Sequence, residues 1–546
     1  MRAWYIAIFV AVFGFYLLTS SREPAWGDAR PMWEVADRLV QHGAIDIKTR
    51  WPDDMPPGEG GKTYGIAAIG TVLVHAPGVA LAAATHSAAP RHDVLLRPIF
   101  THLAPAALGA LACLLFFGLL RDLGRSARTA SLCTAILACA TTVWVYARMP
   151  YGEILQVASF VGVFRYMLRV LGDPARRSES GALDLGPSKR NALWLGAWAG
   201  VLFNTKYVYA MAIAGAALLI AWSLRKQRAE LKRVVLWASV TAGPLLVLAL
   251  VYNYLRFGSI TQTGYEPYLS WYFGGSVFDG AWGMLASANK SALLYSPPLV
   301  LALLGWPRAI REHRVLGIAL AVLVVPTFIV YCTYRSWSGD YAWGPRYFVW
   351  TIPVLLVGLA WFVDTMGRYK RVLVGAVIAA GIVVQLLGSA LYWDHFIRIA
   401  IETKNQWLGN PNRSGAYIPE KGRGHCDSCF EDTYEILWTP AFQPIKGHWW
   451  LVKSIARGDA DGIEAQVDAP WRRYTSLSIN LSSTYPRARI DWWGLLWIKD
   501  AKHTWLAGLL LLLLFTAVTA FGIWRWIRLH RSGIAGLDAE GSAEPT

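Results

Sequence analysis

The sequence has few charged residues for its length. Only 16% of its 546 residues are charged, whereas 55% are hydrophobic and the mean hydropathy is +0.34. A soluble domain carries about 25% charged residues. The apolar residues come in blocks of about 15 to 25, the length that crosses the hydrocarbon of a bilayer. Because these blocks are continuous rather than alternating, they disfavour a β-barrel and predict an all-α, polytopic membrane protein.

A nucleic-acid motif is also lacking, although the formal net charge is +16. Basic residues gather in short loops between the apolar blocks, as the positive-inside rule expects of cytoplasmic loops. No basic stripe marks a soluble module. The 28 Trp residues fit a membrane protein as well, because Trp favours the interface between lipid and water. The charge therefore indicates a lipid bilayer as partner, and no nucleic acid.

Cysteine is scarce, and histidines with the spacing of zinc ligands are absent. Of six Cys, four lie in apolar blocks and are most simply small core residues. Cys426 and Cys429 form a Cys-x-x-Cys in a polar region, which fits a redox pair, a metal half-site or a disulfide. An oxidising compartment favours the disulfide. No secretory cleavage site is evident, so residues 1–18 are expected to remain as a signal anchor.

Counting the basic loops assigns each apolar block to a side of the membrane. The first span runs from Trp4 to Leu18, and an outer loop follows over residues 19–95. The block from Tyr64 to Thr85 would reverse every later loop if it crossed, so we expect it outside as a juxtamembrane element. The block 192–222 has basic loops at both ends and is predicted to be a hairpin turning near residues 204–206. About twelve spans result, with both termini cytoplasmic.

The spans divide the chain into four parts. Residues 1–395 form the transmembrane module and residues 396–503 a small outer domain with mixed α/β character. Residues 504–528 are the last span, and residues 529–546 are a cytoplasmic tail expected to be disordered. No internal repeat is visible, which weakens a secondary-transporter interpretation. An aromatic anchor at the membrane interface is predicted at Trp492, Trp493 and Trp497.

Asp28 stands at the outer surface, where an amphipathic helix begins. Pro31 suits the first position of that helix and Gly43 its end. Apolar residues on one face and charged residues on the other predict a helix that lies in the interface plane. Two interpretations of Asp28 follow. It either caps this helix or serves as a catalytic carboxylate.

Several cations lie on the outer side, where the positive-inside rule predicts none. Each alone is explained by a side chain that snorkels to the interface. Together, and facing Asp28 and Glu153, they indicate a pocket for an anionic lipid that carries a phosphate. The cations are Lys62, Arg97, Arg148, Lys206 and Arg346.

Short motifs in the first 395 residues resemble the GT-C superfamily of glycosyltransferases that use polyprenyl-phosphate sugars. They resemble lipid A aminoarabinose transferases and protein O-mannosyltransferases most closely, and their order and sidedness carry the likeness. Two departures concern the Pro-Pro dipeptide that often opens the second juxtamembrane helix and the acidic dipeptide of the catalytic loop. Thr63-Tyr64 and Asp28-Ala29 replace them. The motifs are Gly27-Asp28, Lys62-Thr63-Tyr64-Gly65, Leu96-Arg97-Pro98, residues 146–153, Asn204-Thr205-Lys206-Tyr207 and Gly344-Pro345-Arg346-Tyr347-Phe348.

The resemblance implies inverting transfer of a sugar from a polyprenyl-phosphate donor to an acceptor hydroxyl at the outer face of a bacterial inner membrane. It makes Asp28 the base or a metal-orienting group, Glu153 a second carboxylate, and the five cations ligands of the lipid phosphate. A divalent metal (Mg, Mn or Zn) is compatible but not required, and the acceptor can be a glycan, a lipid or a protein. The alternatives are a transporter or flippase of lipid-linked sugars and a non-catalytic envelope assembly protein. Candidate substrate contacts are Arg30, Glu34 and Tyr64.

Overall fold

The fold is built from helices. The computed structural model describes residues 1–22, 28–48, 58–172, 186–266, 269, 273–339, 341–365, 367–393, 396–397, 399–400, 436–457, 490–499 and 501–541. These residues contain no strand, only the isolated bridges Phe273–Tyr334 and Leu391–Ile490. The predicted pair Cys426 and Cys429 lies outside the described residues.

The helices follow one another closely along the first half of the chain. They are α1 (Arg2–Leu18), α2 (Ala29–His42), α3 (Ile69–Leu73), α4 (Ala76–Ala88), α5 (Asp93–Asp122), α6 (Ala127–Ala140), α7 (Val143–Ala147), α8 (Glu153–Leu171), α9 (Lys189–Phe203), α10 (Ala210–Ser223) and α11 (Arg228–Phe257).

The second half adds shorter helices and a long last one. They are α13 (Val277–Ala286), α14 (Ala292–Tyr295), α15 (Pro298–Glu312), α16 (Arg314–Ala319), α17 (Val325–Cys332), α18 (Ile352–Leu356), α19 (Gly358–Asp364), α20 (Arg368–Ala390), α23 (Pro444–Ala456), α25 (Gly494–Lys499) and α26 (Ala501–Gly541).

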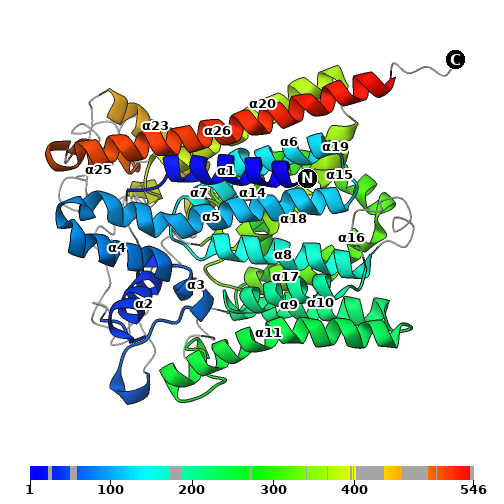
Figure 1. Ribbon diagram of the computed structural model, residues 1–546, viewed down its shortest axis with the longest axis horizontal. Helices are drawn as coiled ribbons and strands as arrows, with labels where there is room; N and C mark the ends of the chain where they lie inside the picture. The colour runs from blue at the N-terminus through cyan, green and yellow to red at the C-terminus, as the bar shows by residue number, and fades with distance from the viewer. Residues whose placement is uncertain are drawn as a thin grey trace.

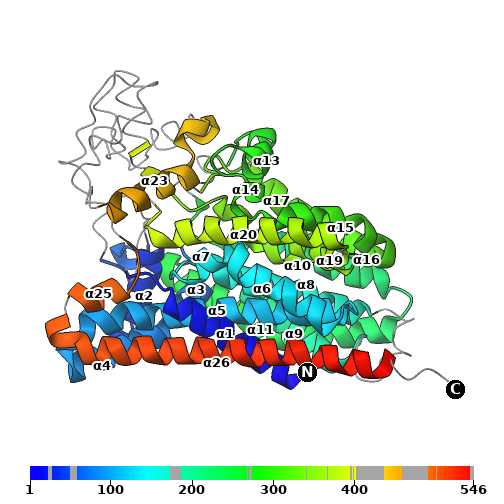
Figure 2. The same cartoon turned by 90° about the horizontal axis from the view of Figure 1, so that it is seen from above.

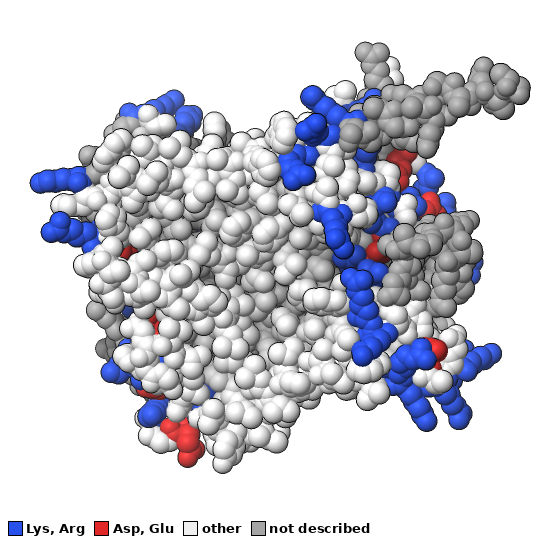
Figure 3. Space-filling model, viewed as in Figure 1, with Lys and Arg blue, Asp and Glu red and all other residues white. Residues whose placement is uncertain are grey.

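Seven helices of the described residues are long and apolar enough to cross a membrane, or eight if a pair bent by 41° is one span. On the face shown in Figure 3, Lys and Arg gather at the two ends and leave an almost uncharged middle. The prediction of an all-α, polytopic membrane protein is therefore confirmed. The number of twelve spans stays a prediction, because α1, α6 and the apolar helix Tyr207–Ser223 fall below the length of that test.

Two local predictions are confirmed. The block 192–222 is a hairpin of α9 and α10, and its turn lies at Asn204, Thr205 and Lys206. Helix α2 ends at Gly43, whose φ of 63° is the left-handed conformation that glycine adopts without strain. The α2 helix begins slightly earlier than predicted, at Ala29.

The block predicted to stay outside is broken into α3 and α4. Residues 69–88 still pass the test of length and composition for a span, so their place relative to the bilayer stays a prediction. Helix α4 packs on α2 and α5. Both α2 and α4 lie at the end of the molecule that is opposite the C-terminus (Figure 1).

The first and last long helices pack side by side in Figures 1 and 2, the red α26 along the blue α1. A small residue allows this close approach. A Cβ added to Gly14 would stand 2.6 Å from Thr519 Oγ1. Helix packing within lipid relies on such small residues, because apolar burial gives little gain there.

The structure corrects two predictions about the C-terminal part. Trp493 is fully buried, and its indole donates to the carbonyl of Leu18 at 3.1 Å, so it belongs to the core rather than to an interfacial anchor. Helix α26 continues to Gly541, so residues 529–541 are helical where disorder was predicted. Helix formers such as Ala535 and Leu537 support that extension. In the described part of residues 396–503, the elements are helices, and the strands expected there fall outside it.

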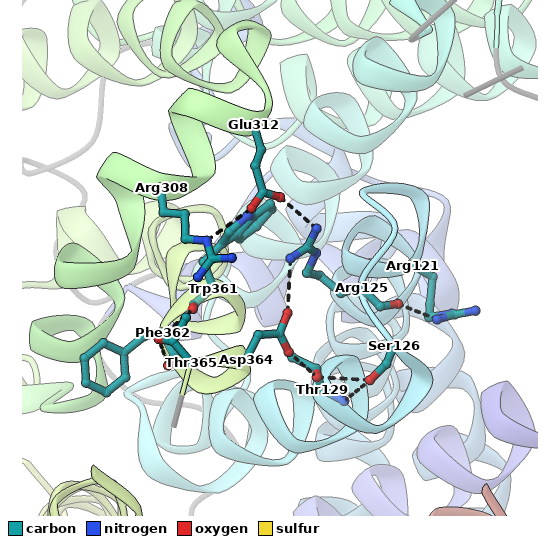
Figure 4. A network of polar contacts seen from close by, with 10 residues as sticks. All are labelled: Arg121, Arg125, Ser126, Thr129, Arg308, Glu312, Trp361, Phe362, Asp364 and Thr365. Atoms are coloured by element: carbon teal, nitrogen blue, oxygen red, sulfur yellow. Dashed lines mark hydrogen bonds and ion pairs between the residues drawn. The ribbon is translucent and has the colours of Figure 1, made fainter. Parts of the chain in front are cut away.

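A polar network closes the end of the bundle away from α2 (Figures 1 and 4). Arg125 donates to Glu312 at 2.9 Å and to Asp364 at 3.1 Å, and its guanidinium lies 4.3 Å from the Trp361 ring. Thr129 donates to the other oxygen of Asp364 at 2.6 Å. One cation thus ties the start of α6 to α15 and α19.

Replacing Arg125 by glutamine is expected to destabilise the protein by about 1–3 kcal/mol, because two carboxylates lose a largely buried charged donor. The measurement is the unfolding temperature in detergent, with Arg311→Gln on the exposed surface of α15 as the matched control. Equal unfolding temperatures for the two variants would contradict the role given to the network.

Candidate functional site

Arg346 joins two carboxylates that are far apart in the sequence. Its Nη1 lies 2.5 Å from Asp28 Oδ2, and its Nε lies 2.5 Å from Glu153 Oε1. Gly339 makes room for this side chain, since its φ is +71° and a Cβ there would meet Arg346 Cβ at 2.5 Å. Lys206 completes the group. We call Asp28, Glu153, Lys206 and Arg346 the Arg346 cluster.

Asp28 occupies the N-cap position of α2, but its carboxylate makes no capping hydrogen bond. The carboxylate turns instead to Arg346, and 62% of its side chain is exposed. The Arg346 guanidinium, and more weakly Lys206, lower the pKa of Asp28. The capping interpretation of Asp28 is therefore wrong for its side chain. An exposed, ionised carboxylate beside two cations is the geometry that a substrate approaching from water can reach.

Glu153 is the buried member of the pair. It stands in the first turn of α8, where the partial positive charge of the helix end favours an anion. Its side chain is 4% exposed, and its Oε2 has no hydrogen-bond partner among the described residues. Glu153 therefore fixes Arg346 from below and keeps one acceptor available.

Lys206 reaches the cluster from the turn between α9 and α10. Asn204 holds that turn by donating to Gly200 at 2.8 Å and to Leu245 at 2.9 Å. The Lys206 ammonium lies 4.6 Å from the Tyr347 ring. Burial, and then the nearby Arg346, lower the pKa of Lys206 to about 8. This lysine is charged at neutral pH but has little reserve.

Four of the predicted site residues are thus brought together, and Arg97, Arg148 and Lys62 are not. Arg97 pairs with Asp93 at 2.9 Å on its own helix. Arg148 is fully buried and pairs with Asp491 at 2.9 Å. Lys62 is exposed, and the carboxylate it influences is that of Asp46. The pairs formed by Arg97 and Arg148 leave these cations outside the Arg346 cluster.

The three candidate substrate contacts have separate places. Arg30 is exposed in the first turn of α2. Glu34 accepts a hydrogen bond from the backbone N–H of Lys48 at 2.6 Å. Tyr64 is buried, and its ring meets the edge of Phe257 with 6.2 Å between centroids. None of these three contacts the Arg346 cluster through an interaction described for them.

The sequence alone did not single out Tyr347 as a site residue. Its ring lies beneath both Lys206 and Arg346, at 4.6 Å and 5.8 Å from the charged groups, and stacks on Tyr331 at 5.3 Å. Rings in this position attract cations through their π-faces. Its position directly after Arg346 in the predicted motif was the available signal.

The donor set does not fit a resident divalent metal. The described residues contain no group of three or more His, Cys, Asp or Glu with metal-binding geometry. The two carboxylates of the cluster are bridged by a guanidinium, whose charge would repel a cation at that point. No catalytic step below uses a metal.

Comparison with known proteins gives no close relative. No family model matches the chain, and no curated protein matches it. Among solved structures it is similar to ArnT from Cupriavidus metallidurans bound to undecaprenyl phosphate, at 15% identity and a TM-score of 0.47, over 85% of this chain and 80% of that one. The apo form of the same protein gives 15% and 0.47, over 84% and 79%.

An oligosaccharyltransferase from Archaeoglobus fulgidus, in complex with Zn and sulfate, is also similar, at 11% identity and a TM-score of 0.39, over 75% of this chain and 57% of that one. These likenesses agree in kind with the family resemblance of the motifs. At such identities and TM-scores they decide nothing about activity, so the function proposed next rests on the residues of this chain.

Proposed function

We propose that the protein is an inverting glycosyltransferase that moves a sugar from a polyprenyl-phosphate donor to an acceptor hydroxyl. The observation that carries the proposal is the bridge from Asp28 through Arg346 to Glu153, with Lys206 beside it. The cluster combines an exposed carboxylate with two cations. This is the set of charges that hydroxyl activation and phosphate departure require.

Asp28 is the general base of the proposed reaction. As the acceptor oxygen attacks the anomeric carbon, Asp28 takes its proton, and the bond from that carbon to the phosphate oxygen breaks. The electron pair leaves with the phosphate, whose growing charge Arg346 and Lys206 stabilise. Attack from the side opposite the phosphate inverts the anomeric centre. Glu153 holds Arg346 in place throughout.

The proposed cell location follows from the same assignment. The donor is a membrane lipid, and the Arg346 cluster lies near α2, at the end opposite the C-terminus. With both termini in the cytoplasm, as the basic loops predict, the cluster faces the periplasm of a bacterial inner membrane. A sugar lipid presented at that face would meet acceptors of the cell envelope.

The test is an assay of the purified protein with a panel of radiolabelled polyprenyl-phosphate sugars and membrane acceptors. A glycosyltransferase releases polyprenyl phosphate and labels the acceptor, whereas a flippase moves the sugar lipid intact. Labelled acceptor that depends on Asp28 supports the proposal. Movement of intact sugar lipid without release of polyprenyl phosphate refutes it.

Binding of polyprenyl phosphate is expected to weaken as pH rises above 8. An anion prefers the charged form of Lys206, and that form is lost above its pKa of about 8. By linkage the dissociation constant should rise by up to about tenfold per pH unit. Tryptophan fluorescence titrations between pH 7 and 9.5 would measure it.

Two variants of Lys206 sharpen this pH test. Lys206→Arg keeps its charge throughout the range and should bind with a pH-independent affinity above pH 8. Lys206→Ala should bind weakly at every pH. An affinity of the wild-type protein that stays constant up to pH 9.5 would remove Lys206 from the phosphate site.

A further inference from the structure

A second buried ion pair lies behind the Arg346 cluster. Arg148 and Asp491 are 0% and 1% exposed, and Arg148 Nη1 lies 2.9 Å from Asp491 Oδ2. Arg148 Nη2 also donates to the backbone carbonyl of Asp491, and its Nε donates to the carbonyl of Thr19 at 2.6 Å. The guanidinium therefore holds the end of α1 and residue 491 at once.

Asp491 uses its remaining carboxylate oxygen on the segment that leads to Asp28. Oδ1 accepts from the Ser21 hydroxyl at 2.7 Å and from the backbone N–H of Arg22 at 3.1 Å. The N–H of Ser21 in turn donates to the carbonyl of Arg148 at 3.3 Å. Ser21, Arg148 and Asp491 thus form a closed ring of contacts.

The residues next to Asp491 fasten it further. The indoles of Trp492 and Trp493 both donate to the carbonyl of Leu18, at 2.8 Å and 3.1 Å. The N–H of Asp491 donates to Ala390 at 2.8 Å, at the end of α20. Residue 491 is therefore anchored to three separate parts of the helical module.

The two segments held by Asp491 are those that deliver the two carboxylates of the site. Residues 19–22 lead from α1 toward Asp28, and Arg148 lies shortly before Glu153 at the start of α8. Both segments come from the N-terminal part of the chain, whereas Asp491 comes from beyond residues 396–489. Nothing in the local sequence of either segment fixes their mutual distance.

We infer that Asp491 is a positioning residue, which sets the spacing between Asp28 and Glu153 through Ser21, Arg22 and Arg148. The inference rests on the proposed function. A misplacement of about 1 Å costs about a hundredfold in rate when reacting groups must be aligned. Asp491 acts through the backbone of these segments and needs no contact with substrate.

The test uses the double variant Arg148→Met with Asp491→Leu. Asp491→Leu alone leaves Arg148 buried without a counter-charge, so this single variant is expected to fold poorly. Replacing both residues by apolar ones of similar size removes that penalty. A purely structural ion pair would thus be replaced without loss of activity, whereas a positioning role would not.

We expect the double variant to unfold near the wild-type temperature, to bind polyprenyl phosphate within about twofold of wild type, and to transfer sugar about 10- to 100-fold more slowly. Amide hydrogen exchange in the full-length protein should be faster in the peptides that contain Asp28 and Glu153. Exchange does not depend on any enzyme activity. A wild-type transfer rate in the double variant, or unchanged exchange in those peptides, overturns the inference.

Asp28→Asn serves as the reference in the same assay. If Asp28→Asn is inactive and the double variant has the wild-type rate, the proposed function stands and only the role of Asp491 fails. If Asp28→Asn keeps the wild-type rate, the proposed function fails. The exchange measurement then decides whether Asp491 orders these segments.

Discussion

Asp28→Asn is expected to abolish sugar transfer while leaving the protein folded, with a loss of about 10²–10⁴-fold in kcat. The amide keeps the size of the side chain and can still accept a hydrogen bond from Arg346, but it cannot take a proton from the acceptor. Because Asp28 makes no capping hydrogen bond and is 62% exposed, its replacement should cost little stability. The measurement is the initial rate of acceptor labelling at saturating donor.

The matched control for this variant is Asp37→Asn. Asp37 is also on α2, but its carboxylate only accepts from Gln41 on the exposed side of the helix. We expect Asp37→Asn to transfer at the wild-type rate. Near wild-type activity in Asp28→Asn, at equal amounts of folded protein, would rule out Asp28 as the base.

Arg346→Ala is expected to have the second large effect, on both activity and stability. Removal of one donor that stabilises developing charge costs about 10²–10³-fold in kcat. Glu153 would also be left buried without its cation, a change that costs about 3–5 kcal/mol when a buried pair is broken. The measurements are transfer rate and unfolding temperature on the same preparation.

Two further variants separate the roles of Arg346. The double variant Arg346→Ala with Glu153→Gln removes the unpaired charge, so it should regain part of the lost stability but no activity. Arg335→Ala, on the exposed loop before Arg346, should leave both properties unchanged. Recovery of transfer in the double variant would show that Arg346 serves the fold alone.

Hydropathy predicted the helical membrane fold, because long apolar blocks and confined charges can satisfy their backbone only as helices within lipid. The hairpin of α9 and α10 followed from basic loops at both of its ends. Span limits were less predictable. The bend between Leu356 and Gly358 and the breaks around α3 and α4 depend on packing with neighbours, which no local pattern records.

The sequence placed Asp28, Glu153, Lys206 and Arg346 on one side of the membrane, and the structure brings them together. It placed Arg97 and Arg148 on that side as well, but their counter-ions were not visible in the same way. Asp93 lies one turn from Arg97, and Asp491 is separated from Arg148 by most of the chain. Sidedness thus selects candidates, and only tertiary contacts show which cations are already neutralised.

The packing of α1 against α26 has a consequence for the order of synthesis. Chains emerge from the ribosome N-terminus first. The helix that leads to Asp28 is therefore inserted long before α26, its neighbour, and before Asp491, which fastens its end. Every residue of the Arg346 cluster is already in the membrane by then, yet its framework is still incomplete. Assembly of the site is in this sense a late event, completed by residues that take no part in the chemistry.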